Sequence, residues 1–305
     1  MELKNTIAQS VSLSGKGLHT GKEVHLTFHP ADVDYGIRFV RTDLAAKPEI
    51  RAHISHVRDT SRGTSLCDNG VEIKTLEHLM AALAGLSIDN LQIEIDSDEL
   101  PILDGSARLY VECFQKTGLQ PQNKEREYIE IKEVISYTNA DLGVYLEVAP
   151  ADFCSVEVNV DYGTHVLAQQ KATLNRISDF FPEVYNCRTF VFLHELSFLM
   201  EQNLVKGGDV ENAIVFVDKI PDQETLDKLA KFFNKSDIQV MPNGTLNNVQ
   251  LRHENEPARH KLLDLIGDLY LLGKPIKGKI TATKPGHLAN TEFAKVIAAS
   301  VGCAL

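Results

Sequence analysis

Three residues at four-residue spacing in the segment EPARHKLLDLIGDLYLLG have side chains that could bind a metal ion. His260, Asp264 and Asp268 are separated by about one helical turn each, so a helix would place them on one face. A histidine and a carboxylate four residues apart can bind the same metal ion, and an open catalytic zinc site typically has three protein ligands. A zinc site would therefore need a third ligand from elsewhere in the chain. Histidine-carboxylate pairs at this spacing are also common as surface or capping pairs.

The segment TLEHLMAALAGL offers that third ligand. We predict a helix that begins just before Glu77, with Thr75 as its N-cap and Gly85 at its end. His78 would lie in the first turn, where the helix dipole favours the neutral imidazole that a metal requires. The carboxylate of Glu77 would lie beside the same metal and could accept a proton from an attacking water. The combination predicts metal-assisted hydrolysis, although a Glu-His dipeptide alone is a weak signal.

Two further segments contain residues of chemical interest. His287 lies in TATKPGHLAN, which we interpret as a loop that follows a strand. Such loops commonly carry an exposed general acid, but a loop histidine is usually only solvated. The segment SGKGLHTG differs from the GxGxxG dinucleotide fingerprint and lacks the Lys-Ser/Thr pair of a phosphate-binding loop, so it predicts a tight turn.

Hydrophobic periodicity predicts an α+β fold that positions these residues. Alternating apolar residues predict strands, and apolar residues at helical spacing predict helices. The strands are expected near residues 24–28, 37–39, 91–95, 143–149, 154–161 and 276–283. The helices are expected near residues 75–85, 189–203, 222–234 and 256–272. Several strands follow one another without an intervening helix, which favours α+β over α/β.

A polar segment near residues 117–128 predicts a boundary between two domains. The chain has 305 residues and 43% hydrophobic content, which is enough for two cores. Gly118 and Pro121 are expected to interrupt regular structure there. We predict an N-terminal α+β domain at 1–122 that carries the Glu-His motif. A C-terminal α+β domain at 123–305 would carry the HKxxD helix and the Gly-His loop.

Composition limits the classes of partner and compartment. The formal charge of −11 argues against a nucleic-acid partner, because phosphate neutralisation needs a basic face. The 5 cysteines are odd in number and contain no CxxC pair, which is typical of the reducing cytoplasm. The N-terminus lacks the apolar core of a signal peptide, and no apolar run is long enough for stable membrane insertion. We therefore expect a cytoplasmic protein.

Several segments together resemble the UDP-3-O-acyl-N-acetylglucosamine deacetylase family. They are GKGLHTGK (15–22), TLEHLMAALAGLSIDN (75–90), LPILDGSA (100–107), CRTFVF (187–192), LVKGGDVENAIV (204–215), RHKLLDLIGDLYLLG (259–273) and TATKPGHLAN (281–290). The resemblance runs from one end of the chain to the other. It implies zinc-dependent hydrolysis of the N-acetyl group of UDP-3-O-acyl-N-acetylglucosamine, with release of acetate, in lipid A biosynthesis. It also implies two domains, each with a sheet and a helical layer, and with the helices sandwiched between the two sheets.

The resemblance also assigns the metal site and its base. The implied Zn²⁺ ligands are His78, His260 and Asp264, the same set that spacing and helix geometry suggest. Glu77 becomes the general base. One departure concerns Gly63, which stands where many relatives have a cysteine; Cys67 lies further along the chain and should not inherit that role.

The resemblance also implies other catalytic roles. It makes His287 the general acid or electrostatic partner, oriented and kept protonated by Asp268. Thr189 would help to hold the oxyanion of the tetrahedral intermediate. Lys261 follows a predicted ligand, so we expect it to point off the metal face, and the resemblance implies that it contacts the nucleotide-sugar. The alternative is an ordinary solvated lysine.

The implied substrate contacts lie in three segments. His19, Gly207 and Gly208 match family positions near the substrate. The apolar run RTFVFLHELSFLM would line a passage for the acyl chain, or could be ordinary core. Its candidate lining residues are Phe190, Val191, Phe192 and Leu196.

Two other functions remain open on the sequence. The chain could be a zinc amidase for a different acylated amino sugar, or a catalytically silent module that binds nucleotide-sugars. Some members of the family continue into a hydroxyacyl-carrier-protein dehydratase. We expect any such partner, fused or separate, to lie outside this chain.

Overall fold

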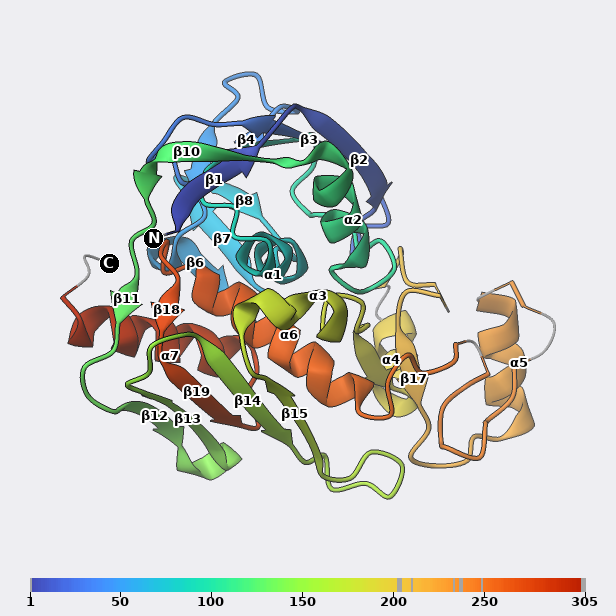
Figure 1. The fold of residues 1–305 in the computed structure, drawn as a ribbon. Helices are drawn as coiled ribbons and strands as arrows, with labels where there is room; N and C mark the ends of the chain where they lie inside the picture. Colours follow the sequence, from blue (N-terminus) through green and yellow to red (C-terminus); the bar gives the residue numbers. More distant parts are fainter. Residues whose placement is uncertain are drawn as a thin grey trace.

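The computed structural model describes residues 2–201, 205–209, 211–232, 234–235, 238–247 and 249–302. It confirms the α+β class: two five-stranded sheets face one another, and helices α1, α6 and α7 lie between them (Figure 1). No helix within these described ranges is both long and apolar enough to cross a membrane.

The first sheet has the strand order β2-β3-β9-β4-β5. Its strands are β2 (Val11–Lys16), β3 (Glu23–Pro30), β9 (Leu91–Ile95), β4 (Ile37–Arg41) and β5 (Glu49–Arg51). Helices α1 (Glu77–Gly85) and α2 (Arg108–Thr117) cover its inner face. Phe28 of β3 is buried and lies edge-on to Phe114 of α2, with ring centroids 4.9 Å apart. The predicted alternation therefore turns one side of each strand toward the helices.

The second sheet has the order β12-β13-β19-β14-β15. Its strands are β12 (Ile135–Asn139), β13 (Val144–Ala149), β19 (Lys279–Thr283), β14 (Ser155–Val160) and β15 (Gln170–Leu174). Helices α6 (Glu256–Tyr270) and α7 (His287–Ser300) pack on it. In both sheets the central strand is the last one in the sequence, and it pairs in parallel with one of its neighbours. The two halves thus repeat one topology, in which α1 and α6 occupy equivalent places.

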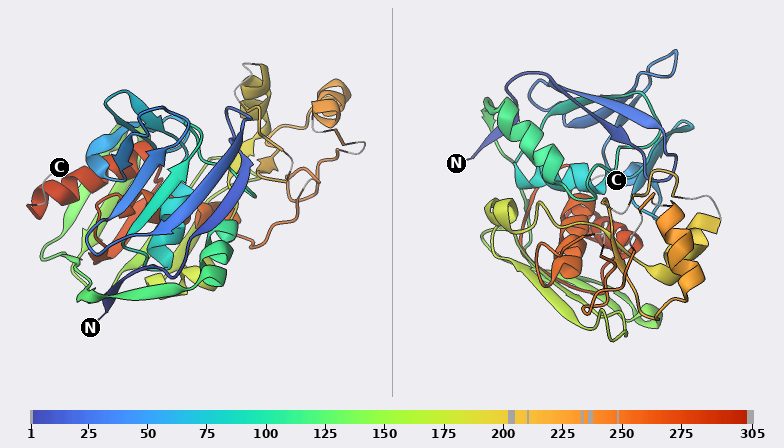
Figure 2. Two further views of the ribbon diagram at one scale, coloured as in Figure 1. Left: turned by 90° about the horizontal axis from the view of Figure 1, so that it is seen from above. Right: turned by 90° about the vertical axis from the view of Figure 1, so that its right-hand side faces the viewer.

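The remaining elements lie outside the two five-stranded sheets and the helices that pack on them. They are β1 (Leu3–Ile7), η1 (Ile54–His56), β6 (Val57–Asp59), β7 (Ser65–Asp68), β8 (Val71–Ile73), β10 (Leu119–Glu125), β11 (Ile129–Glu130), η2 (Ala140–Leu142), η3 (Ile177–Asp179), α3 (Phe180–Glu183), β16 (Phe190–Phe192), α4 (Leu193–Glu201), β17 (Ile214–Phe216), α5 (Gln223–Phe232) and β18 (Ile276–Lys277). The elements α4 and α5 form a lobe that projects to one side of the sheets (Figure 2).

Three local predictions were wrong. The segment near 189–203, predicted as one helix, starts as strand β16 and becomes helical only at Leu193. Its aromatic and β-branched residues favour the strand, which pairs with β17. Residues 202 and 203 lie outside the described ranges. Thr75 is not the N-cap of α1, since Leu76 occupies that position without a side-chain hydrogen bond. Pro121 does not interrupt regular structure, because β10 pairs there with β1 at the edge of the fold. The domain boundary at residue 122 stays a prediction.

The close approach of α1 and α6 depends on a glycine in the middle of α6. A Cβ atom on Gly267 would lie 2.1 Å from the backbone oxygen of Glu77, so no larger residue fits without moving one helix. This contact joins the two halves next to the predicted metal ligands.

Gly267→Ala should therefore destabilise the protein, against the usual trend. A glycine in a helix interior is normally about 1 kcal/mol worse than alanine, but overpacking costs typically about 1–3 kcal/mol. We expect a lower free energy of unfolding in urea and a lower Tm. Gly286→Ala is the control, since its Cβ would meet nothing within 4 Å. Equal or higher stability of Gly267→Ala would contradict the close contact.

Candidate metal centre

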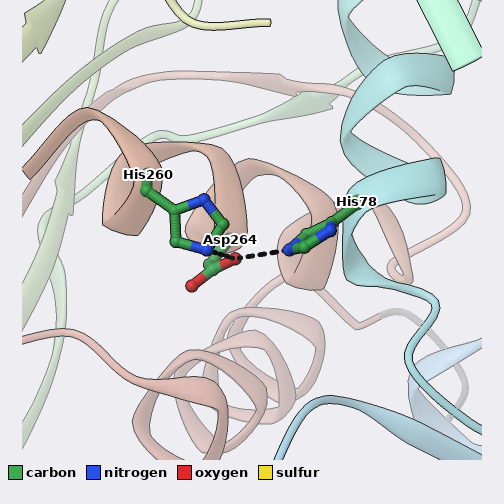
Figure 3. A group of neighbouring side chains, drawn as sticks. All are labelled: His78, His260 and Asp264. Carbon is green, nitrogen blue, oxygen red and sulfur yellow. Dashed lines mark ion pairs between the residues drawn. The ribbon is translucent and has the colours of Figure 1, made fainter. Parts of the chain in front are cut away.

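Helices α1 and α6 bring the three predicted ligands together. The ligand atoms of His78, His260 and Asp264 all lie within 4.8 Å of one another, and all three side chains are buried. Asp264 Oδ1 is 3.7 Å from His78 Nε2 and 3.3 Å from His260 Nε2. The imidazoles point toward the carboxylate from two different helices (Figure 3). The expected cluster is therefore present in space.

Burial sets the charge of each member of this cluster. Burial, and then the nearby His260, lowers the pKa of His78 to about 3, and burial also lowers the pKa of His260. Burial alone would raise the pKa of Asp264, but His260 and Lys261 outweigh it and hold this pKa below its usual range. Near neutral pH the cluster consists of two neutral imidazoles and one carboxylate.

The hydrogen bonds of the cluster leave electron pairs facing one another. His260 Nδ1 lies 3.1 Å from the carbonyl oxygen of Cys187, which can only accept, so Nδ1 carries the proton and Nε2 is bare. Asp264 Oδ1 is buried and accepts no hydrogen bond from any residue that the structure describes. An orphaned carboxylate oxygen beside a bare imidazole nitrogen is costly unless a cation completes the group. The residues therefore fit a divalent metal ion.

Glu77 begins α1 and lies next to this cluster. Its Oε2 accepts a hydrogen bond of 2.9 Å from the backbone N–H of Thr64. Burial raises its pKa to about 7, with His287 opposing and Asp264 adding to the shift. A carboxylate with a pKa near the operating pH can both accept and release a proton. Gly63 permits its position, because a Cβ there would lie 2.8 Å from Glu77 Oε1.

His287 is held by the carboxylate one turn beyond Asp264. Its Nδ1 donates to Asp268 Oδ2 at 3.0 Å, and Asn290 Nδ2 donates to the same oxygen at 2.8 Å. Burial would lower the pKa of His287, but Asp268 and then Asp264 raise it to about 9. His287 Nε2 lies 3.9 Å from Asp264 Oδ2. The imidazolium therefore faces the cluster of predicted ligands, with Nε2 as its available donor.

The predictions from the sequence misplaced His287 and missed two of the residues around it. His287 is the first residue of α7 and not part of a loop. The hydroxyl of Thr64, which donates to Asp268 Oδ1, was missed because no motif marks it. Asn290 was missed because α7 was not predicted. A helix through HLANTEFAKVIAAS would have placed Asn290 one turn from His287.

The side chain of Lys261 does not point in the direction that was expected. Its Nζ donates to Asp264 Oδ2 at 2.9 Å, so the prediction that it points off the metal face is wrong. The long side chain runs forward along the helix to Asp264, which is three residues ahead and buried. Nζ also lies 5.7 Å from the ring centroid of Phe190. The side chain remains 20% exposed, which leaves it accessible to a bound molecule.

A cavity of about 620 Å³ lies beside the cluster. Thr189, Phe190, His19 and Gly208 line it, and the Phe190 ring is 6.3 Å from the His260 ring, centroid to centroid. The cavity is therefore close to the metal cluster.

The apolar part of the cavity comes from the run that the sequence singled out. Val191 and Leu196 line it, together with Phe198 and Leu199 of α4. Phe192 does not: it is only 7% exposed and packs against Phe216 and Tyr162. The run therefore contributes both to the lining of the cavity and to the core.

Gly207 supports one wall without lining the cavity. Its N–H donates to the Leu18 carbonyl at 3.0 Å, and a Cβ at this position would lie 2.1 Å from the Gly17 oxygen. The turn that carries His19, itself predicted from the sequence, is thus packed against the turn that carries Gly208.

Comparison with known proteins gives one family match and several similar proteins. The model of the family described as UDP-3-O-acyl N-acetylglycosamine deacetylase matches residues 4–230 and 228–299. The chain is 43% identical over 97% of its length to a protein of Porphyromonas gingivalis named "Bifunctional enzyme LpxC/FabZ", and covers 64% of that protein. It is 44% identical to the protein of the same name from Bacteroides thetaiotaomicron and covers 63% of it. It is also 39% identical to the "UDP-3-O-acyl-N-acetylglucosamine deacetylase" of Saccharophagus degradans, over 95% of this chain and 88% of that one. The chain thus spans just under two thirds of the bifunctional relatives.

Proposed function

Because the chain belongs to the UDP-3-O-acyl N-acetylglycosamine deacetylase family, we propose that it is a zinc-dependent amidohydrolase. Its substrate would be UDP-3-O-acyl-N-acetylglucosamine, and its products acetate and the free amine, in lipid A biosynthesis. The observation that carries this proposal is the buried group of His78, His260 and Asp264 beside Glu77. Two neutral imidazoles and a carboxylate form a ligand set that zinc favours, although iron could also bind them.

The residues around the cluster divide the reaction between them. A cation bound there would act as a Lewis acid on the amide carbonyl. Glu77, whose Oε2 is held by the Thr64 amide, accepts a proton from the attacking water. The water oxygen adds to the acetyl carbon, so that the carbonyl oxygen becomes a tetrahedral oxyanion, and the C–N bond breaks when this oxyanion collapses to give acetate. His287 donates the proton from Nε2 to the departing amine, because its Nδ1 is held by Asp268. The Thr189 hydroxyl donates to the oxyanion.

The cavity supports the choice of an acylated substrate. Its apolar lining of Val191, Leu196 and Phe198 suits a hydrocarbon chain, which gains about 0.8 kcal/mol per buried methylene. Lys261 is partly exposed at the boundary between the cluster and Phe190 and is proposed to contact the nucleotide-sugar. His19 and Gly208, from the two packed turns, are proposed to complete that contact with the support of Gly207.

Val191→Trp should shorten the passage and discriminate against long acyl chains. Losing the burial of about two methylenes costs about 1.6 kcal/mol, so kcat/KM should fall by roughly tenfold or more for long chains. It should stay near the wild-type value for a short-chain analogue. Val134→Trp is the control, because Val134 is 58% exposed elsewhere. An equal loss for both chain lengths would argue against an acyl passage.

Metal analysis followed by an acetate-release assay tests the whole proposal. We expect purified protein to contain about one zinc or iron ion per chain and to release acetate from UDP-3-O-acyl-N-acetylglucosamine. Turnover of an acylated amino sugar that lacks UDP would favour the alternative amidase. Metal-loaded, folded protein that binds the nucleotide-sugar without releasing acetate would be a silent binding module and would overturn the proposal.

Compartment and partner are proposals with separate support. The cytoplasm is supported by Cys67, Cys113, Cys154 and Cys187, which are all free thiols; Cys303 lies outside the described residues. A dehydratase partner, fused or separate, is supported by the bifunctional name of the Porphyromonas gingivalis and Bacteroides thetaiotaomicron relatives.

A further inference from the structure

A buried carboxylate at the start of α6 has no role in the proposed reaction. Glu256 is 0% exposed, and its two oxygens accept several hydrogen bonds. Oε1 accepts from the backbone N–H of Arg188 at 3.0 Å and from Arg188 Nε at 2.9 Å. Oε2 accepts from Arg188 Nη2 at 3.2 Å and from the backbone N–H of Arg252 at 2.6 Å. These donors satisfy the buried charge.

The same peptide unit connects this carboxylate to the metal cluster. The amide that joins Cys187 to Arg188 donates its N–H to Glu256 Oε1 and accepts, through its C=O, the Nδ1–H of His260 at 3.1 Å. Glu256 and His260 are four residues apart on α6, so one helix face holds both ends of this peptide. The carbonyl cannot turn away from His260 without breaking the bond to Glu256.

Neighbouring bonds hold the rest of this segment. Arg252 Nη1 donates to the carbonyl of Asn186 at 2.5 Å, and Arg252 Nη2 donates to Asp104 Oδ2 at 3.0 Å. On the other side, Thr189 N–H donates to the Gly105 carbonyl at 2.8 Å. The peptide between Cys187 and Arg188 is therefore fixed from outside as well as by α6.

We propose that Glu256 is a positioning residue for the metal centre, acting through the Cys187–Arg188 peptide on the tautomer and orientation of His260. The carbonyl keeps the proton of His260 on Nδ1 and leaves Nε2 for the metal. Hydrogen-bond partners behind a metal-binding histidine typically change metal affinity or activity by roughly 10- to 100-fold when they are removed. This inference rests on the proposed function, because it assumes that His260 binds a metal.

Glu256→Gln tests the proposal, because it keeps the shape of the side chain and removes the charge. One oxygen becomes an NH₂ group that cannot accept from Arg188 or Arg252. In the zinc-loaded full chain we expect roughly 10- to 100-fold weaker zinc binding in competition with a chelator. We also expect faster solvent exchange of the His260 Nδ1 proton, followed by ¹⁵N-edited NMR. A folded variant with wild-type zinc affinity and wild-type exchange would overturn the proposal.

Two further variants separate positioning from a general loss of structure. Glu183→Gln is the matched control, because Glu183 is an exposed carboxylate that also pairs with an arginine, Arg259 of α6; neither readout should change. Arg188→Lys weakens the ion pair but keeps the backbone N–H bond to Glu256. It should lower Tm, while zinc affinity and the exchange rate of the His260 Nδ1 proton stay within about threefold of the wild type. That change is well below the loss expected when a hydrogen-bond partner behind a metal-binding histidine is removed. Loss of zinc affinity equal to that of Glu256→Gln would assign the effect to the ion pair and overturn the role of the peptide.

The wild-type protein keeps the proposal testable if Glu256→Gln does not fold. In the wild type, His260 must carry its proton on Nδ1, and that proton must be protected from exchange. A proton on Nε2, or rapid exchange at Nδ1, would overturn the proposal. If the wild type binds no metal, the proposed function fails, but the tautomer of His260 in the metal-free full chain still reports on the role of Glu256.

Discussion

Glu77→Gln should lower kcat by roughly 100- to 10,000-fold while the protein keeps its metal, because a positioned general base typically contributes that much. Glutamine preserves the size of the side chain and still offers an oxygen to the Thr64 N–H, which donates to Glu77 at 2.9 Å. It cannot accept a proton. Steady-state acetate release and metal content, measured on the same preparation, check this result.

The control for this substitution is Glu99→Gln. Glu99 is also fully buried, but it accepts hydrogen bonds from the backbone N–H groups of His19 and Thr20 and lies outside the metal cluster. Its loss should alter KM through the His19 turn and leave kcat within about tenfold, below the usual contribution of a general base. Near-normal kcat in Glu77→Gln would remove Glu77 from the mechanism.

The three residues of the cluster could be singled out from the sequence because each lies on a helix with a strong local pattern. Helix α6 combines Pro257 in its first turn with an apolar stripe, which fixes the face that carries His260 and Asp264. The start of α1 just before His78 was clear even though its predicted cap was wrong. Convergence of the two helices could not be derived from either pattern, since it depends on how Gly267 lets them touch.

The groups that orient the ligands could not be predicted from residue types. The carbonyl of Cys187 fixes His260 and the N–H of Thr64 fixes Glu77, and backbone groups are present at every position. The turn of Lys261 toward Asp264 follows from the buried charge of the carboxylate, which only the packed structure reveals. Sequence patterns thus indicate the candidate catalytic side chains better than the hydrogen bonds that orient them.

The repeated topology explains why the ligands come from distant segments. Helices α1 and α6 occupy equivalent places between the two sheets, so the cluster forms where the halves meet. A site divided in this way requires both halves to be docked. The contact at Gly267 and the cluster should therefore be lost together when the halves separate.

Asp264→Asn should abolish stable metal binding and, with it, activity. The substitution removes the only negative charge among the three ligands, so we expect zinc affinity to fall by more than roughly 100-fold, the upper end for loss of an outer-shell partner. Acetate release should fall at least as far as in Glu77→Gln, but for a different reason. Metal analysis distinguishes the two variants, since only Asp264→Asn should lose its metal.

The fold of Asp264→Asn should survive the loss of the metal. An asparagine amide at this position can donate to His260 Nε2, which lies 3.3 Å from Oδ1, and so replaces two facing electron pairs with a hydrogen bond. Without metal, its Tm should therefore equal or exceed that of the metal-free wild type. Asp268→Asn is the matched control, one turn along the same helix face: it should keep its zinc, because Asp268 contacts His287, Asn290 and Thr64. Wild-type zinc affinity in Asp264→Asn would exclude this carboxylate from the metal site.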